Sequence, residues 1–139
     1  MIVVDTNVAS ELMRPSPATA VRDWVRARGG HELYTTSITI AEIRYGIERL
    51  PDGRRKELLR TTAEDVFAAF EDQVLPFDVS AAAAYASIVS GRDSIGLPID
   101  GFDAQIASIC RTHSAALATR NGTDFQSTGI TLIDPWQAA

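Results

Sequence analysis

The stretch MIVVDTNVASEL, residues 1–12, predicts a strand, an acidic residue and a helix in immediate succession. Residues 2–4 form a short β-branched apolar run, which is typical of a strand buried on both faces of a sheet. A helix is predicted directly after it, at about residues 7–13, and it ends before Pro15. Asp5 stands between the two elements, where it can cap the helix or serve as a functional carboxylate. Its role depends on whether other acidic residues occupy equivalent places further along the chain.

Short strands and helices alternate through the rest of the sequence. The strands are predicted at residues 2–4, 32–37, 74–78, 115–119 and 130–136, and the helices at about 7–13, 18–28, 40–50, 54–71, 80–90 and 99–112. The apolar residues expected to be buried on two of these helices are Leu58, Leu59, Val66, Phe67 and Phe70, and then Ile99, Phe102, Ile106 and Ile109. This order predicts an α/β fold with a central parallel β-sheet of four to five short strands, flanked by helices on both faces.

Composition limits the classes of function. The chain of 139 residues is 45% hydrophobic, has a net charge of -5, and contains one cysteine and two histidines. These values indicate one globular domain without disulfides or a cysteine-rich zinc site. No apolar run is long enough for a membrane span and no export signal is evident, so the cytoplasm is the expected location. The negative charge argues against nucleic-acid binding by the whole surface, but a local basic groove remains compatible with it.

Four acidic residues follow predicted strands or lie on the helices that lead from them: Asp5, Glu42, Asp103 and Asp124. Each also has a purely structural interpretation. Asp5 can cap a helix, Glu42 can close a capping box with Thr39, Asp103 can favour a helix dipole, and Asp124 can belong to a turn. Helical geometry places Asp103 at the margin of a buried face, where a carboxylate is rarely left without a partner.

If these carboxylates converge, they require protons or cations, because two of them about 4 Å apart repel by roughly 4 kcal/mol at an effective dielectric constant near 20. Ligand sets made only of oxygen atoms favour hard ions such as Mg²⁺ or Mn²⁺. Such an ion beside a phosphodiester can activate water and neutralise the leaving oxygen. The natural chemistry of a carboxylate cluster is therefore phosphodiester hydrolysis.

Four segments together resemble one known family. MIVVDTNVASEL, SITIAEIRYGI, GFDAQIASICRTHSAALATRNGTDF and the closing IDPW resemble PIN-domain ribonucleases of the VapC type, over residues 2–136. The resemblance implies a single PIN domain over residues 1–139 with a PIN-like fold. It also implies a Mg²⁺-dependent endoribonuclease, with Mn²⁺ as a possible substitute, acting as the toxin of a type II toxin–antitoxin system. The implied partners are an RNA substrate, a small cognate antitoxin whose C-terminal segment wraps the toxin, and a second copy in a homodimer.

The resemblance also assigns roles to residues. Asp5, Glu42 and Asp103 match the principal acidic positions, while the fourth position falls on either Asn121 or Asp124. Asp5 and Asp103 are expected to ligate Mg²⁺ most directly, with Glu42 and Asp124 holding metal-bound waters. The residues expected to support them are Thr6, Asn7, Thr119, Arg120 and Asn121. The alternative is a PIN-like module that binds RNA or protein and has a weak metal site.

Arginines near the cleft are candidates for RNA binding, because RNA approaches an acidic cleft unfavourably unless cations surround it. The candidates are Arg14, Arg22, Arg26 and Arg44. Each can equally be a solvated surface residue.

Overall fold

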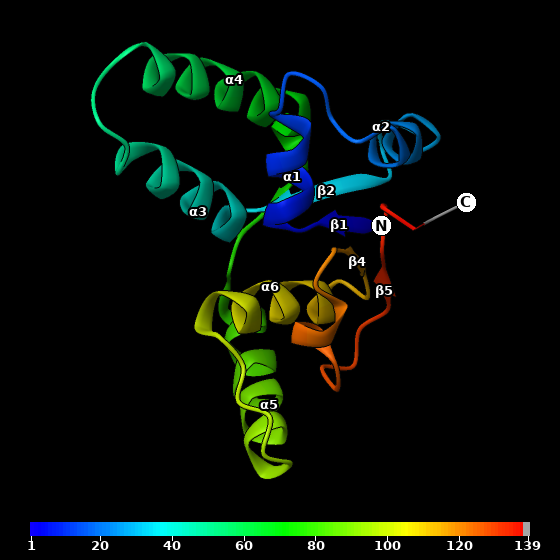
Figure 1. Ribbon diagram of the computed structural model, residues 1–139. Coiled ribbons are helices and arrows are strands. Elements are labelled where there is room, and N and C mark those ends of the chain that lie inside the picture. The colour runs from blue at the N-terminus through cyan, green and yellow to red at the C-terminus, as the bar shows by residue number, and fades with distance from the viewer. Residues whose placement is uncertain (138–139) are drawn as a thin grey trace.

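Five short parallel strands form the central sheet in the computed structural model, which describes residues 1–137 (Figure 1). They are β1 (Ile2–Val4), β2 (Leu33–Thr36), β3 (Val74–Leu75), β4 (Ala116–Ala118) and β5 (Leu132–Ile133), and their order across the sheet is β3-β2-β1-β4-β5. In the central strand, Ile2 pairs in register with both Leu33 and Ala116. The predicted parallel α/β sheet is confirmed.

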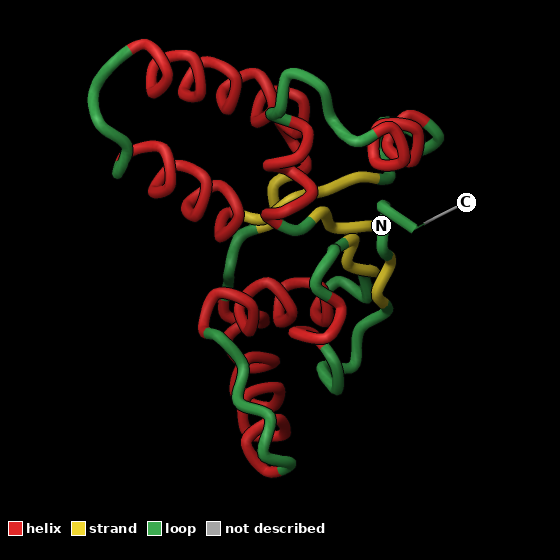
Figure 2. The backbone as a smooth tube through the Cα atoms, viewed as in Figure 1, coloured by secondary structure: helices red, strands yellow, loops and turns green. Residues whose placement is uncertain are grey.

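Helices cover both faces of this sheet, as Figures 1 and 2 show. The α-helices are α1 (Thr6–Leu12), α2 (Thr19–Arg26), α3 (Ser37–Glu48), α4 (Arg54–Phe70), α5 (Val79–Ser94) and α6 (Gly101–Thr112), with short 3-10 turns η1 (Glu71–Gln73) and η2 (Gly122–Phe125). The helices α5 and α6 lie below the sheet in this view, and α1, α2 and α4 lie above it. The helices α3 and α4 form an antiparallel pair that extends beyond the sheet edge.

The central strand β1 is buried on both faces, as its apolar run predicts. Val3 packs with Ile106 and Leu117 in one core, and Val4 packs with Val8 and Trp24 in the other. Successive side chains of a strand point to opposite faces. A run of three apolar residues can therefore contribute to two separate cores.

The strand order reverses next to β1. From β1 the chain moves outward to β2 and β3, and then crosses under the sheet through α5 and α6 to β4 on the other side of β1. Open parallel sheets bind ligands in the crevice beyond the carboxyl ends of the strands at such a reversal. In this chain that place is occupied by Asp5, directly after β1, and Thr119, directly after β4.

The helix α3 starts earlier than predicted, and the capping box that is the structural interpretation of Glu42 does not form. The helix begins at Ser37 instead of about residue 40, and its N-cap is Thr36, whose hydroxyl oxygen accepts a 3.1 Å hydrogen bond from the Thr39 amide. Thr39 lies inside the first turns of the helix, so Glu42 does not cap it. The polar run after β2 contains several threonines and serines, and each of them can cap a helix.

Two apolar residues expected in the core lie at the surface instead. Leu58 is 64% exposed and Phe102 is 50% exposed. In α4 the residues turned inward are Ala63, Phe67 and Phe70, while in α6 they include Ile106 and Ile109. Within residues 1–137, no helix combines the length and hydrophobicity that crossing a membrane requires.

Candidate active site

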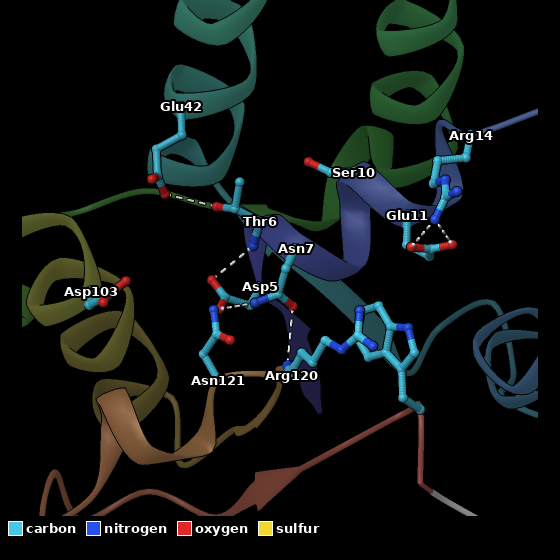
Figure 3. Close-up of a pocket in the computed structure, with 11 residues that line it drawn as sticks. Asp5, Thr6, Asn7, Ser10, Glu11, Arg14, Glu42, Asp103, Arg120 and Asn121 are labelled. Carbon is cyan, nitrogen blue, oxygen red and sulfur yellow. Dashed lines mark hydrogen bonds and ion pairs between the residues drawn. The ribbon is translucent and has the colours of Figure 1, made fainter. Parts of the chain in front are cut away.

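A cavity of about 600 Å³ opens at the carboxyl ends of β1 and β4. Its lining comes from α1, α3, α6 and the segment after β4 (Figure 3). The residues that line it are Asp5, Thr6, Asn7, Ser10, Glu11, Arg14, Glu42, Asp103, Arg120, Asn121 and Trp136. Of the four predicted acidic ligands, the fold therefore brings Asp5, Glu42 and Asp103 to one cavity.

Asp5 is held rigidly at the base of this cavity. It is only 4% exposed, and its Oδ1 accepts a 2.8 Å hydrogen bond from the amide of Thr6, so that it caps α1. Its Oδ2 accepts hydrogen bonds from the Thr119 hydroxyl at 2.8 Å and from Asn7 Nδ2 at 3.2 Å. Burial raises the pKa of Asp5 above its ordinary value, against the lowering effect of these hydrogen bonds. Asp5 thus caps α1 and also lines the cavity, so its structural interpretation leaves the functional one open.

Thr119 links the ends of β1 and β4. Besides donating to Asp5, its hydroxyl oxygen accepts hydrogen bonds from Asn7 Nδ2 at 3.2 Å and from the amide of Asn121 at 3.1 Å. One donated and two accepted bonds saturate a hydroxyl. Thr119 and Asn7 therefore contact the acidic site in the places that the sequence predicts for supporting residues.

Glu42 reaches the cavity from α3 and is fixed by α1. Its Oε1 accepts a 2.8 Å hydrogen bond from the hydroxyl of Thr6. Burial is the main cause that raises the pKa of Glu42, and the charges of Asp5 and Asp100 raise it further. The contact to Thr6 replaces the capping contact that was predicted for this carboxylate.

Asp103 is the most strongly perturbed carboxyl group of the site. It is half-buried in the first turn of α6 and points toward the cavity in Figure 3. Burial and the nearby charge of Asp5, followed by those of Asp100, Asp124 and Glu42, raise its pKa to about 7. Titratable groups perturbed by burial and by a specific cluster of like charges are typical of functional sites.

Asp124 lies further out than the other three acidic residues. It belongs to the exposed turn η2, outside the cavity lining, whereas Asn121 is part of that lining. The charge of Asp124 nevertheless raises the pKa of both Asp5 and Asp103. The turn is near enough to contribute to the field of the site, while Asn121 is the residue of this segment that faces the cavity.

The side chains fit a hard divalent cation in their chemistry. Asp5, Glu42 and Asp103 offer only oxygen ligands, and burial first and neighbouring negative charge second raise their pKa values. A bound cation would oppose both effects, because it stabilises the ionised carboxylates. Within residues 1–137, no three Asp, Glu, His or Cys side chains come close enough to hold one ion together. Mg²⁺ usually takes only one or two carboxylates directly and keeps several waters. The spacing therefore fits an ion bound partly through water.

The four arginines predicted to bind RNA occupy different environments. Arg14 lines the cavity and contacts Glu11 at 3.4 Å. Arg44 is paired with Glu64 and lies over Phe67. Arg22 and Arg26 are exposed on α2, outside the cavity lining. Of these four, Arg14 is the one that the fold places in the site.

Three residues near the site carry roles that the sequence pattern did not indicate. Glu11 is 6% exposed and accepts a 2.9 Å hydrogen bond from the amide of Ala18. Trp136 lines the cavity and lies under the guanidinium of Arg120. Arg92 is buried beneath the turn that carries Asp124. Helical position within α1 could have indicated Glu11, because it falls on the same side of the helix as the buried Val8.

Comparisons with known proteins agree with the fold. The family model described as "PIN domain" matches residues 2–130. The chain is 37% identical to VapC ribonuclease Y4jK of Sinorhizobium fredii, over 100% of both chains, and 36% identical to Toxin FitB of Neisseria gonorrhoeae, over 98% of this chain and 99% of that one. The crystal structure of FitAcB from Neisseria gonorrhoeae superimposes with a TM-score of 0.92 and 35% identity, covering 99% of this chain and 100% of that one. The chain belongs to the PIN-domain family.

Proposed function

We propose that this protein is a Mg²⁺-dependent endoribonuclease and the toxin of a type II toxin–antitoxin system, acting in the cytoplasm. The observation that carries the proposal is the arrangement of Asp5, Glu42 and Asp103, which come from three separate segments and line one cavity at the switch point of the sheet. The names of two relatives, a VapC ribonuclease and a toxin, support the same function.

The residues proposed to hold Mg²⁺ directly are Asp5 and Asp103. Glu42, and Asn121 or Asp124 at the edge of the cavity, would hold waters bound to the ion. When bound, the ion would supply positive charge to the scissile phosphate and make the attacking water more acidic. Mn²⁺ has the same preference for oxygen ligands and is expected to substitute for it.

The chain itself contributes a fixed arrangement of acceptors. Three donors, the amide of Thr6, the hydroxyl of Thr119 and the side-chain amide of Asn7, hold both oxygens of Asp5. The Thr6 hydroxyl holds one oxygen of Glu42, so that its other oxygen is available to orient water. Preorganisation of this kind removes the need to reorder charged groups during the reaction.

The expected protein partner is a small antitoxin that covers the site. An apolar groove of about 580 Å³ adjoins the cavity between α1, α3 and α4, and shares Thr6, Ser10, Arg14 and Glu42 with it. Its apolar lining includes Met13, Ile43, Ile47 and Leu59. A segment that occupies this groove would end next to the carboxylates and block access to them. We also expect a homodimer, which sedimentation of the isolated protein would detect.

One observation favours a second candidate, a PIN-like module that binds RNA or protein without efficient catalysis. Within residues 1–137 the acidic side chains are too far apart for three of them to hold one ion directly. A weak site of this kind would leave thermal stability unchanged at millimolar Mg²⁺ or Mn²⁺. A functional site is stabilised in proportion to the ion bound by the folded state.

RNA cleavage by the purified protein tests the proposal. Single-stranded RNA is incubated with the wild type and with Asp103→Asn, in the presence of Mg²⁺ and of a chelator. We expect internal cleavage only by the wild type with Mg²⁺, because loss of one ligand carboxylate costs several kcal/mol of transition-state stabilisation, or orders of magnitude in rate. Equal cleavage by both proteins, or cleavage in chelator, would contradict the proposal.

A further inference from the structure

The cavity of the candidate active site is unevenly charged. In Figure 3 Glu42 and Asp103 lie on one side of Asp5, while Arg14 and the side chain of Arg120 extend on the other side. Both arginines belong to the lining. A substrate that crosses the cavity therefore passes from an acidic wall to a basic one.

The two arginines differ in how their charge is used. Arg14 forms an ion pair with the buried carboxylate of Glu11, with both oxygens of Glu11 3.4 Å from Nη1. Arg120 is exposed, and within residues 1–137 it forms no ion pair with a carboxylate. Arg120 is thus the lining cation whose charge is available to a ligand.

Arg120 is also held in place on two sides. Its backbone amide donates a 3.2 Å hydrogen bond to Oδ1 of Asn7, which ties it to the residue that contacts Asp5. Its guanidinium carbon lies 4.8 Å from the centroid of the Trp136 ring. A guanidinium that lies on an aromatic face keeps the N–H donors of its edge free for a planar pair of acceptor oxygens.

Trp136 gives this arginine a firm platform. Its ring packs against the core cluster that contains Val4, Val8 and Trp24, and its amide donates a 2.9 Å hydrogen bond to Oδ1 of Asp134. The indole is therefore fixed by contacts that do not depend on Arg120. This arrangement orients the guanidinium before any ligand arrives.

We propose that Arg120, stacked on Trp136, is a subsite for an RNA phosphate adjacent to the scissile one. The proposal rests on the ribonuclease function proposed above. The acidic wall repels every phosphate that no bound cation neutralises, so the next phosphate along the strand needs a protein cation on the opposite wall. Arginine satisfies this need with two parallel hydrogen bonds to phosphate oxygens. Trp136 acts through Arg120 as a positioning residue, because the guanidinium covers its ring.

Binding measurements on a non-cleaving background test the subsite. Anisotropy of short, labelled, single-stranded RNAs of random sequence is measured against Asp103→Asn with Mg²⁺, over a range of salt concentrations. Adding Arg120→Ala is expected to weaken binding roughly tenfold and to make the log–log salt dependence shallower by about 0.7, the value for one phosphate contact with a single strand. The matched control is Arg111→Ala, which removes one exposed arginine in the last turn of α6, and it is expected to change neither quantity.

Substitutions of Trp136 separate its positioning role from direct contact with a base. Trp136→Phe keeps an aromatic face and is expected to bind as the parent does, whereas Trp136→Leu weakens binding and reduces the salt dependence as Arg120→Ala does. Binding of Mn²⁺ by Arg120→Ala should equal that of the unsubstituted protein, because Arg120 does not contact the carboxylates.

Two results would overturn the subsite. One is equal RNA binding by the Arg120→Ala and Arg111→Ala variants. The other is a loss in Trp136→Leu without any change in salt dependence, which would indicate stacking of a base. If the wild type cleaves RNA and either result is found, the subsite alone is wrong. If the wild type cleaves no RNA with Mg²⁺, the proposed function fails, and the subsite fails with it.

Discussion

The hydroxyl of Thr119, directly after β4, donates a 2.8 Å hydrogen bond to Oδ2 of Asp5, directly after β1. The two residues are 114 positions apart in the chain, yet they lie side by side because β1 and β4 are neighbours in the sheet. This bond joins the two strand ends at the point where the strand order reverses. The geometry of the acidic site therefore depends on the central pairing of the fold.

Thr119→Val tests this bond with a side chain of nearly the same shape. The valine removes one of the three donors to Asp5 and leaves the Asn121 amide without its acceptor, so we expect a loss of about 1 to 3 kcal/mol in the free energy of unfolding. RNA cleavage should fall at least tenfold, because Asp5 is no longer held in one orientation. Urea unfolding and cleavage assays measure the two effects. Thr119→Ser retains the hydroxyl and should recover most of the stability and most of the RNA cleavage. A Thr119→Val variant with the stability and cleavage of the wild type would contradict this role.

Thr6→Val tests the connection between α1 and Glu42. It removes the 2.8 Å hydrogen bond that the Thr6 hydroxyl donates to Glu42, but it keeps the bond that the Thr6 amide donates to Asp5. We expect a small change in stability, about 1 kcal/mol, and a larger loss of activity that appears as a higher Mg²⁺ concentration for half-maximal cleavage. Thr6→Ser is the control. An unchanged Mg²⁺ requirement in Thr6→Val would show that Glu42 needs no help from α1.

We expect Asp103 to make the stability of the metal-free protein depend on pH. Its pKa is raised from 3.8 to about 7 in the folded protein, by burial first and by neighbouring charge second. A carboxyl group with a raised pKa stabilises the fold fully below its unfolded pKa, and this contribution is lost as the pH rises through the folded pKa. The melting temperature in chelator should therefore fall as the pH rises from about 4 to about 7.

Asp103→Asn removes the titrating group and provides the control. The variant should melt at a higher temperature than the wild type at about pH 8 in chelator, and the difference should shrink toward about pH 4. Scanning calorimetry measures both proteins across this range. A wild type and a variant that share the same pH dependence would show that Asp103 is not the group responsible.

Arg92 is expected to be a stability determinant that also holds the Asp124 turn. It is 6% exposed, and its guanidinium donates to the carbonyl oxygens of Asp124 at 2.9 Å, Gln126 at 2.8 Å and Pro98 at 3.4 Å. Arg92→Met removes the buried guanidinium and leaves these carbonyl oxygens without their donor, and it should cost about 2 to 4 kcal/mol in the free energy of unfolding. Arg92→Lys keeps one charged donor group, so its free energy of unfolding should lie between those of the wild type and Arg92→Met. Chemical unfolding in urea measures the series, and a methionine variant as stable as the wild type would contradict this role.

The sequence predicts the parts of the fold that depend on local patterns. The apolar run at residues 2–4 indicates the central strand, and the position of Asp103 on its helix indicates a carboxylate at the margin of the core. Cys110 lies on the same helix and is fully buried, and burial raises the pKa of its thiol to about 12. The burial of these residues can be predicted from the spacing of apolar residues along one strand or helix.

The features that the sequence did not predict depend on contacts between distant segments. The cap of α3 was misassigned because a hydroxyl that caps from Thr36 and one that would cap from Thr39 look alike in sequence. Leu58 and Phe102 were expected in the core but lie at the surface. The expectation failed because the spacing of apolar residues does not show which side of a helix packs against the rest of the protein. The choice between Asn121 and Asp124 could not be made, because both follow the same strand and only the course of the turn decides which one lines the cavity.

The function proposed above requires Asp5, Glu42 and Asp103 to form one divalent-ion site, and direct measurement of bound Mn²⁺ tests this most closely. Electron paramagnetic resonance counts the free ion during titration of the wild type and of Asp103→Asn, and Mg²⁺ is then added as a competitor. We predict saturable binding of Mn²⁺ by the wild type, displacement by Mg²⁺, and binding at least tenfold weaker in Asp103→Asn. A wild type that binds no Mn²⁺ at millimolar concentration, or a variant that binds it equally well, would contradict the account.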